Sequence, residues 1–225
     1  MSNASTKAKS GFPNPLQWLG SATLGMLGEI GRLSIFSGKT LGAAFSPRWY
    51  GAQIIRQMIA IGFYSLPVVG LSAVFIGAAL ALNIYSGGSR FGAEQFVPNI
   101  VVLGITRELG VTITGLMLAG RVSAGIAAEI GAMRVTEQID ALKTLSANPF
   151  RYLYAPRFLA GILTLPMLVL IADIIGVMGG WAVSTLGLGF DSTTYLRNTI
   201  DFLTWQDVTV GLIKALVFGG VIAIM

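Results

Sequence analysis

The chain has 225 residues, of which 54% are hydrophobic and only 11% charged, with a net charge of +5 and a mean hydropathy of +0.74. Soluble domains carry about 25% charged residues, so this composition indicates an integral membrane protein with little room for a soluble domain. The chain has no cysteine and no histidine, which excludes a cysteine nucleophile, a Cys/His zinc site and a histidine general base. We expect no metal site, and we assign the positive charge to the membrane surface rather than to a nucleic acid.

The first predicted helix lies near the N-terminus and does not cross the membrane. Asn14 as N-cap, Pro15 at the first helical position and Gln17 at the third match a helix start. The helix predicted from Pro15 to about Phe36 is too polar and glycine-rich to span, and we expect it to lie in the membrane interface. A simple surface helix is the alternative interpretation. Residues 1–52 then form the N-terminal tail and interfacial helix, and residues 53–225 the membrane-spanning domain.

Four apolar stretches follow, and we predict spanning helices in each, since a span needs ~20 residues. Their approximate positions are Ile59–Ile84 with a kink at Pro67, Phe96–Leu118, Phe158–Leu186, and a fourth that begins near Val208. Between them we expect a turn at Ser86–Ser89, a connecting region Ala119–Tyr154 with a helix break at Asn148-Pro149, and a polar loop Gly187–Trp205. The sequence stops at Met225 inside an apolar run, so we expect a truncated protein.

The distribution of Lys and Arg predicts how the chain is oriented. Basic residues are frequent before the first span and between the second and third spans, whereas the other two loops carry few. Positively charged loops stay on the cytoplasmic side. We therefore expect a cytoplasmic N-terminus and a cytoplasmic Ala119–Arg157 region.

A phosphate-binding loop is excluded. Ser37-Gly38-Lys39-Thr40 ends like such a loop, but the pattern requires a glycine where this chain has Leu33, and no strand precedes it. If the protein uses ATP, the nucleotide binds to another chain.

Two opposite charges, Arg107 and Glu108, lie near the middle of the second span. A charge at this depth costs at least ~2.5–3.5 kcal/mol, so such groups face a bundle interior or a watery cavity and find partners. Neighbouring helical residues point about 100° apart, so each is expected to meet a group on another helix. The candidate partners are Asp173 in the third span and Asp207 and Lys214 in the fourth. The charges either hold the bundle together as a static ion-pair network or line a substrate path.

Small residues recur in two places. Gly120, Ala124 and Ala128 are spaced four apart, and Gly176 and Gly180 repeat the spacing in the third span. This pattern lets membrane helices approach closely. Ordinary helix packing is its simplest interpretation.

The segment Ala127–Leu142 is amphipathic and lies in the region predicted to be cytoplasmic. It carries charged Glu129, Arg134, Glu137 and Asp140 among apolar residues that include Leu142. Such a segment suits a helix that docks into a groove of a partner protein. A solvated connector is the alternative.

Several of these residues carry a family resemblance. The blocks Arg107–Gly110, Ala119–Val122 and Ala128–Leu142 closely resemble the MlaE/YrbE permeases, the membrane subunits of MCE-type lipid ABC transporters. Asn148-Pro149 and Tyr154–Arg157 fit the continuation of the family pattern, with Asn148 where aspartate is usual. Val111 stands where the family has proline, which we expect to straighten the second span. The resemblance covers about Gln53 to the end.

The resemblance implies a fold, partners and site residues. The fold is an all-α integral membrane protein with an interfacial helix followed by five spans, of which the fifth lies beyond this sequence, and it forms a homodimer. The partners are an ABC ATPase, which holds ATP and Mg²⁺, and a periplasmic MCE-domain lipid-binding subunit; this chain itself holds no cofactor. The family's lipid-cavity positions correspond to Arg107, Glu108, Asp207 and Lys214. The coupling helix that contacts the ATPase lies within residues 127–142 and involves Glu129, Arg134, Glu137, Asp140 and Leu142.

We therefore expect a non-catalytic permease of the bacterial inner membrane that moves phospholipids between the inner and outer membranes and maintains outer-membrane lipid asymmetry. One alternative is an ion- or proton-coupled secondary transporter that uses Glu108 and Asp173 as proton sites. Another is a membrane scaffold for a periplasmic complex.

Overall fold

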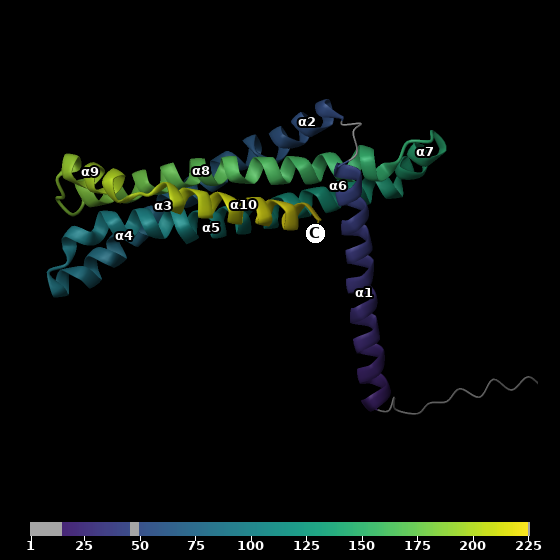
Figure 1. The fold of residues 1–225 in the computed structure, drawn as a ribbon, viewed down its shortest axis with the longest axis horizontal. Helices are drawn as coiled ribbons and strands as arrows, with labels where there is room; N and C mark the ends of the chain where they lie inside the picture. Colours follow the sequence, from purple (N-terminus) through teal and green to yellow (C-terminus); the bar gives the residue numbers. More distant parts are fainter. Residues whose placement is uncertain (1–14, 46–49, 225) are drawn as a thin grey trace, which may run out of the picture.

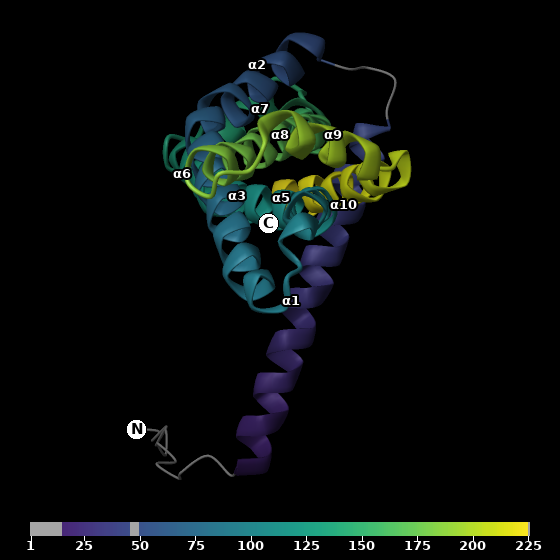
Figure 2. The ribbon, with the colours of Figure 1, turned by 90° about the vertical axis from the view of Figure 1, so that its left-hand side faces the viewer.

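The computed structural model describes residues 15–45 and 50–224, and within these ranges the backbone is helical with short turns. An elongated bundle contains α2 to α10, and the long helix α1 (Pro15–Ala44) points away from one end of it, across its long axis (Figure 1). Figure 2, turned by 90°, also shows α1 extending away from the bundle. α1 begins at the predicted Pro15; its predicted cap Asn14 lies outside the described residues. Because most of α1 is exposed and it lies across the bundle, its arrangement suits a helix in the membrane interface.

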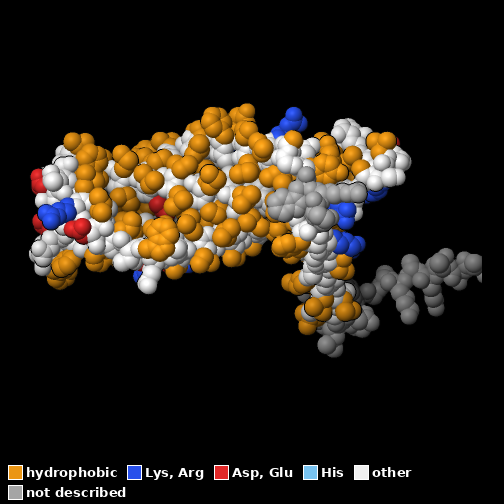
Figure 3. Space-filling model, turned by 45° about the horizontal axis from the view of Figure 1, so that its top comes forward, with side chains coloured by type: hydrophobic (Ala, Val, Ile, Leu, Met, Phe, Trp, Pro, Cys, Tyr) orange, Lys and Arg blue, Asp and Glu red, His pale blue; other side chains and the backbone are white. Residues whose placement is uncertain are grey.

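Four helical segments within the described residues are long and apolar enough to cross a membrane, as predicted. They are Gly51–Phe91, Glu94–Val135, Phe150–Leu186 and Trp205–Ile224. Between a quarter and a half of the most apolar part of each is buried inside the chain. On the face shown in Figure 3, hydrophobic side chains are spread over the surface between the two ends of the bundle, as expected where lipid is the solvent.

The first span comprises α2 (Gly51–Ile61), a short turn η1 (Phe63–Ser65), α3 (Leu66–Gly88) and the turn η2 (Ser89–Phe91). The break lies at Gly62–Ser65 and not at the predicted Pro67, because Pro67 is in the first turn of α3, where its missing N–H needs no partner. At Gly62 a Cβ would lie 2.7 Å from the Thr164 side chain of α8 (Ala155–Leu186) and 2.8 Å from the Met58 carbonyl oxygen. Only glycine therefore allows this joint to press against α8.

The second span is longer than predicted. It begins with the turn η3 (Glu94–Phe96) and continues through α4 (Val97–Gly104), the π turn η4 (Ile105–Leu109), α5 (Gly110–Leu118), the π turn η5 (Ala119–Ser123) and α6 (Ala124–Val135). The predicted end at Leu118 is wrong, because the chain stays helical for another turn and through α6. At 1.5 Å per residue its 42 residues measure about 60 Å, twice the ~30 Å of the hydrocarbon layer. The ends of this helix therefore project beyond the apolar layer, and it passes through Val111 without a break.

The helix α8 (Ala155–Leu186) is the centre of the bundle, and α3 and α10 (Trp205–Ile224) pack along it. A Cβ at Gly77 of α3 would lie 1.8 Å from the Gly176 carbonyl oxygen, and one at Gly180 would lie 3.2 Å from the Gly77 carbonyl oxygen. The close approach predicted from the glycines of the third span is confirmed. A Cβ at Gly120, by contrast, would have no atom within 4 Å, so this small residue of the second span makes no such contact within the described residues.

Two connections differ from the prediction. The loop Gly187–Trp205 contains a helix, α9 (Ser192–Phe202), because Asp191 caps it: its carboxylate accepts hydrogen bonds from the Thr194 backbone N–H and hydroxyl, both at 2.8 Å. The same bonds lower the pKa of Asp191. The segment Ala127–Leu142 is not one helix, because Glu137 adopts a left-handed conformation (φ 57°) that separates α6 from α7 (Gln138–Thr144). The predicted break at Asn148-Pro149 is confirmed, and the π turn η6 (Phe150–Tyr154) leads from it into α8.

Candidate functional site

Four charged side chains meet between the second and fourth spans, and we call them the mid-span cluster: Arg107, Glu108, Asp207 and Lys214. Arg107 Nε lies 2.9 Å from Asp207 Oδ1, and Lys214 Nζ lies 2.6 Å from Glu108 Oε1. Arg107 and Glu108 thus each pair with α10 rather than with each other, which confirms the prediction that their partners lie on another helix. The structure brings together all four residues predicted for the substrate cavity.

The π turn η4 explains why these groups meet. Arg107 and Glu108 lie in this wide turn, and Lys214 Nζ donates a second hydrogen bond to the Arg107 carbonyl oxygen at 3.1 Å. The adjacent Thr106 carbonyl oxygen faces Gly211, where a Cβ would approach it to 2.6 Å. A π turn interrupts the regular hydrogen-bond ladder and often marks a functional site. Here its carbonyl groups and its side chains are held by α10.

Asp207 is fixed from its own helix as well. Its Oδ2 accepts hydrogen bonds from the Thr204 hydroxyl at 2.5 Å and from the Thr204 backbone N–H at 3.2 Å. Thr204 precedes α10 and Asp207 is the third residue of the helix, so its carboxylate makes one of the two bonds of a capping box, while the Asp207 N–H bonds to the Thr204 carbonyl oxygen instead of the hydroxyl. The carboxylate that neutralises Arg107 therefore also closes the first turn of α10.

The cluster is ion-paired but exposed. The side chains of Arg107, Glu108 and Lys214 are 52%, 68% and 38% exposed, whereas that of Asp207 is 7% exposed. Arg107 lies ten residues after Val97, or about 15 Å along the helix, near half the thickness of the ~30 Å apolar layer. Charges exposed at this depth do not face lipid tails. The charged face of a single chain therefore contacts water, a polar ligand or another protein surface, and not lipid tails.

Asp173, the third predicted partner, does not join the cluster. It is buried in α8, and its Oδ1 has no hydrogen-bond partner among the described residues. The oxygen lies against the backbone of Gly110, where a Cβ would come within 1.7 Å of it. Of the three candidate partners, Asp173 is therefore the one that is not used, because η4 turns Arg107 and Glu108 toward α10 while Asp173 faces the start of α5.

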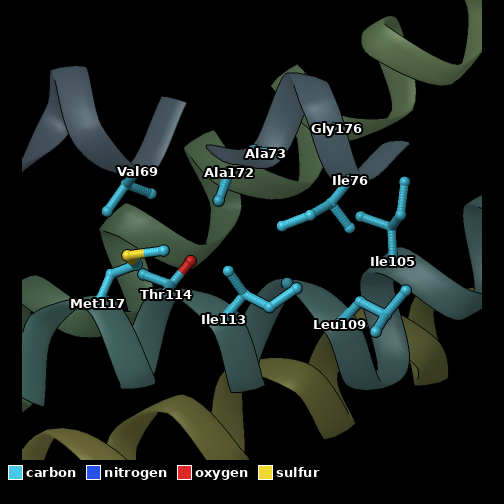
Figure 4. A pocket seen from close by; sticks show the side chains of 11 residues that line it. Val69, Ala73, Ile76, Ile105, Leu109, Ile113, Thr114, Met117, Ala172 and Gly176 are labelled. Atoms are coloured by element: carbon cyan, nitrogen blue, oxygen red, sulfur yellow. The ribbon is translucent and has the colours of Figure 1, made fainter. Parts of the chain in front are cut away.

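A cavity of about 20 Å³ lies near Asp173, and no feature of the sequence predicted it. Figure 4 shows side chains from α3, η4, α5 and α8 around it, including Ile76, Ile105, Ile113 and Met117. Its volume suits a single water molecule and not a lipid tail. Within residues 15–45 and 50–224, no group of three or more metal-ligating side chains is found.

The residues predicted to contact an ATPase are divided between two helices. Glu129 and Arg134 lie on α6, Asp140 and Leu142 on α7, and Glu137 at the turn between them. Four are exposed, and Leu142 is half-buried. The Lys143 ammonium, 2.7 Å from Asp140 Oδ1, lowers the pKa of Asp140, with a smaller contribution from Arg134.

Glu129 faces the bundle. Its Oε2 lies 2.7 Å from Nη2 of Arg157 at the start of α8, and the Arg157 side chain is only 3% exposed. The other two guanidinium nitrogens of Arg157 are buried without a partner among the described residues. Arg157 ties α6 to α8, a contact that the sequence analysis missed; its position directly after Pro156, in a block that fits the family pattern, was the only signal.

The fold and the mid-span cluster define a multi-pass α-helical membrane protein with a polar site on a helix face at mid-depth. Residues 54–225 match the family model described as Permease MlaE. The chain belongs to the MlaE permease family, which confirms the resemblance found in the sequence.

Individual relatives agree with this assignment. The chain is 52% identical over 207 residues to a probable ABC transporter permease protein of Rickettsia bellii, covering 92% of this chain and 80% of the relative. It is 37% identical over 166 residues to the intermembrane phospholipid transport system permease protein MlaE of Haemophilus influenzae, covering 73% of this chain and 64% of that protein. It is 29% identical over 191 residues to the chloroplast protein TRIGALACTOSYLDIACYLGLYCEROL 1 of Arabidopsis thaliana, covering 85% and 55%.

Proposed function

We propose that this chain is the permease subunit of an ABC transporter that moves phospholipids between the inner and outer membranes of a bacterium. The observation that carries the proposal is the mid-span cluster, which is ion-paired yet exposed at mid-depth. A phospholipid presents an anionic phosphate together with apolar chains, and the cluster offers two cations beside largely apolar helix faces. The names of the Rickettsia and Haemophilus relatives support the same function.

A second copy of the chain is the proposed cover of the cluster. Charges at this depth must be shielded from lipid tails, and a twofold dimer would bring two clusters to one central cavity. Arg107 and Lys214 would then meet the headgroup, with Glu108 and Asp207 holding them in place. A periplasmic MCE-domain subunit is the proposed receiver or donor of the lipid.

The segment formed by α6, the turn at Glu137 and α7 (Ala124–Thr144), which we call the α6–α7 elbow, is the proposed contact with a separate ATPase subunit, which would bind ATP and Mg²⁺. Glu137 and Asp140 are exposed on this elbow, and the Glu129–Arg157 ion pair connects it to α8. Movement of the elbow would therefore reach the centre of the bundle. In this proposal residues 1–52 form the tail and interfacial helix, residues 53–225 the permease domain, and the N-terminus is cytoplasmic in the inner membrane.

Lipid occupancy tests the proposal. Arg107→Ala and Lys214→Ala should each reduce the phospholipid that copurifies with the protein, and should weaken detergent resistance of cells, by more than they reduce expression. Arg197→Ala, at an exposed basic residue of α9 outside the cluster, is the matched control. Normal lipid occupancy and normal detergent resistance in both cluster variants would show that the charges are only structural.

A proton-coupled carrier is the second candidate, and one observation favours it: Asp173 is buried without a partner among the described residues. The geometry of Glu108 argues the other way, because its carboxylate is already paired with the Lys214 ammonium at 2.6 Å. Transport by the ATP-supplied complex in the presence of a protonophore separates the two candidates.

A further inference from the structure

A second polar site lies where α1 meets the start of α8, far along the chain from the mid-span cluster. A pocket of about 360 Å³ opens there. Its walls come from two segments that are distant in sequence, and they are Lys39, Gly42 and Ala43 of α1 with Asn148, Phe150 and Arg151. The α1 side includes a glycine, so the pocket is open beside the backbone of that helix.

The chemistry of this pocket suits an anion. Neither Lys39 nor Arg151 forms an ion pair with any residue that the structure describes, and no carboxylate lines the pocket. Asn148 Oδ1 already accepts a hydrogen bond from the Phe150 backbone N–H at 2.9 Å, which leaves the amide N–H groups as its free donors. The Lys39 ammonium lies 5.9 Å from the centre of the Phe150 ring, a cation–π contact that holds it over the pocket. The side chains thus offer donors and positive charge.

The position of the pocket identifies the kind of anion. Basic side chains gather at the end of the bundle where α1 joins it (Figure 3). One helical turn before Lys39, α1 exposes the apolar side chain of Ile35, and further toward its N-terminus it exposes Leu24, Leu27 and Ile30. Basic pockets between membrane helices at such an end bind the head groups of anionic lipids. A lipid can place its phosphate in the pocket while its chains cover exposed apolar side chains of α1 such as Ile35, whereas a free phosphate would leave them uncovered.

We propose that this pocket binds the phosphodiester head group of an anionic phospholipid from the leaflet that borders this end of the bundle. The site is distinct from the proposed transport cavity, because no residue is shared with the mid-span cluster. Its consequence is to fix α1. Among the described side chains, this helix contacts the bundle near its C-terminus, where the Phe36 ring packs edge-on against Tyr154 at 5.0 Å and tilted against Phe150 at 5.8 Å, and where Thr40 and Ala44 are buried. A bound head group would add a bridge from Lys39 to Arg151 across the same junction.

Hydrogen–deuterium exchange of the full chain in lipid nanodiscs tests the proposal. The probes are phosphatidylcholine nanodiscs with and without phosphatidylglycerol, and the readout is exchange in peptides that cover residues 36–45 and 148–154. Phosphatidylglycerol should slow exchange there in the wild type. Each surface basic residue strengthens binding by about 1 kcal/mol, or about fivefold, so Lys39→Gln with Arg151→Gln should raise the phosphatidylglycerol content needed by about thirtyfold.

Arg32→Gln with Lys143→Gln is the matched control, because it removes two cations that are each ion-paired within their own helix, to Glu29 and Asp140. It should retain the wild-type response. If the double variant does not fold, the single variants Lys39→Gln and Arg151→Gln replace it. Each should raise the phosphatidylglycerol content needed for protection about fivefold. Raising the salt concentration on the wild type should also reverse the protection.

Three outcomes would overturn the proposal. Phosphatidylglycerol could still slow exchange in the double variant, or the control variant could lose this protection as fully as the double variant does. The third is that millimolar inorganic phosphate, in phosphatidylcholine nanodiscs, protects the wild type as well as phosphatidylglycerol does. The last would assign the pocket to a soluble anion. Peptides that cover residues 105–110 report on the mid-span cluster separately, so failure of this site is distinguishable from failure of the proposed transport function.

Discussion

Replacing the two carboxylates of the mid-span cluster by their amides should have unequal effects on stability. Asp207→Asn and Glu108→Gln each remove one negative charge with little change in shape. Asp207 is nearly buried and pairs with Arg107, whereas Glu108 is 68% exposed and its partner Lys214 keeps a hydrogen bond to the Arg107 carbonyl oxygen. We therefore expect Asp207→Asn to be the more damaging change.

The magnitudes follow from burial. Breaking a fully buried pair costs about 3–5 kcal/mol, and exposed pairs contribute about 0.2–1 kcal/mol. The Asp207–Arg107 pair is buried on one side only, so we expect a loss of about 2 kcal/mol in the free energy of unfolding. For Glu108→Gln we expect less than about 1 kcal/mol. With about 2–4 °C per kcal/mol for a chain of this size, the Tm should fall by about 4–8 °C for Asp207→Asn and by less than about 4 °C for Glu108→Gln.

Tryptophan fluorescence during heating measures these shifts in detergent, since the chain has four tryptophans. Asp201→Asn is the control, because its pair with Arg197 is exposed and long at 3.8 Å, and it should leave the Tm within about 1 °C. If the two variants lose Tm equally, or if Glu108→Gln loses more, side-chain exposure in a single chain does not rank the two ion pairs.

Three further outcomes are expected. Reversing Glu137 and Asp140 to lysine should prevent copurification of the ATPase and its lipid-stimulated hydrolysis while the permease still folds, because both carboxylates are exposed on the α6–α7 elbow; wild-type pull-down and hydrolysis would contradict this. Gly77→Ala should lower the Tm by several degrees, because its Cβ would lie 1.8 Å from a carbonyl oxygen of α8 and overpacking costs about 1–3 kcal/mol. Gly87→Ala on the same helix has open space around it and should leave the Tm unchanged. Equal Tm values for the two variants would refute the close packing of α3 on α8. Transport by the ATP-supplied complex should persist with a protonophore, and Glu108→Gln should reduce transport without altering this insensitivity; collapse of transport on adding the protonophore would favour the proton-coupled candidate.

The four spans, and the need of each mid-span charge for a partner on another helix, could be predicted because both follow from the apolar stretches of the sequence and the charges within them. An apolar stretch of sufficient length has few alternatives in a membrane, and a charge within it must find a partner. Asp207 and Lys214 were the available groups in the fourth span, and both were found beside η4. The glycines of the third span also predicted their contact correctly, because only a missing side chain permits backbones to touch.

The errors lie where tertiary contacts decide between similar local options. Asp173 was as good a candidate partner as Asp207 by sequence, but the π turn at Ile105–Leu109 directs Arg107 and Glu108 away from it. No sequence signal distinguishes a π turn from regular helix, because the two differ only in bonding the backbone five residues apart rather than four. Here α10 stabilises the wider turn through Lys214 and Gly211.

The sequence by itself determined that this chain is a multi-pass membrane protein of the MlaE permease family, because composition, apolar lengths and the residue blocks around Arg107 and Leu142 are properties of the chain alone. Only the tertiary structure decided that Glu129 turns inward to Arg157, that the elbow after Val135 divides the expected coupling helix, and that Lys39 and Arg151 share one pocket. Each of these depends on the direction of a side chain or on the meeting of distant segments, and packing around α8 sets both.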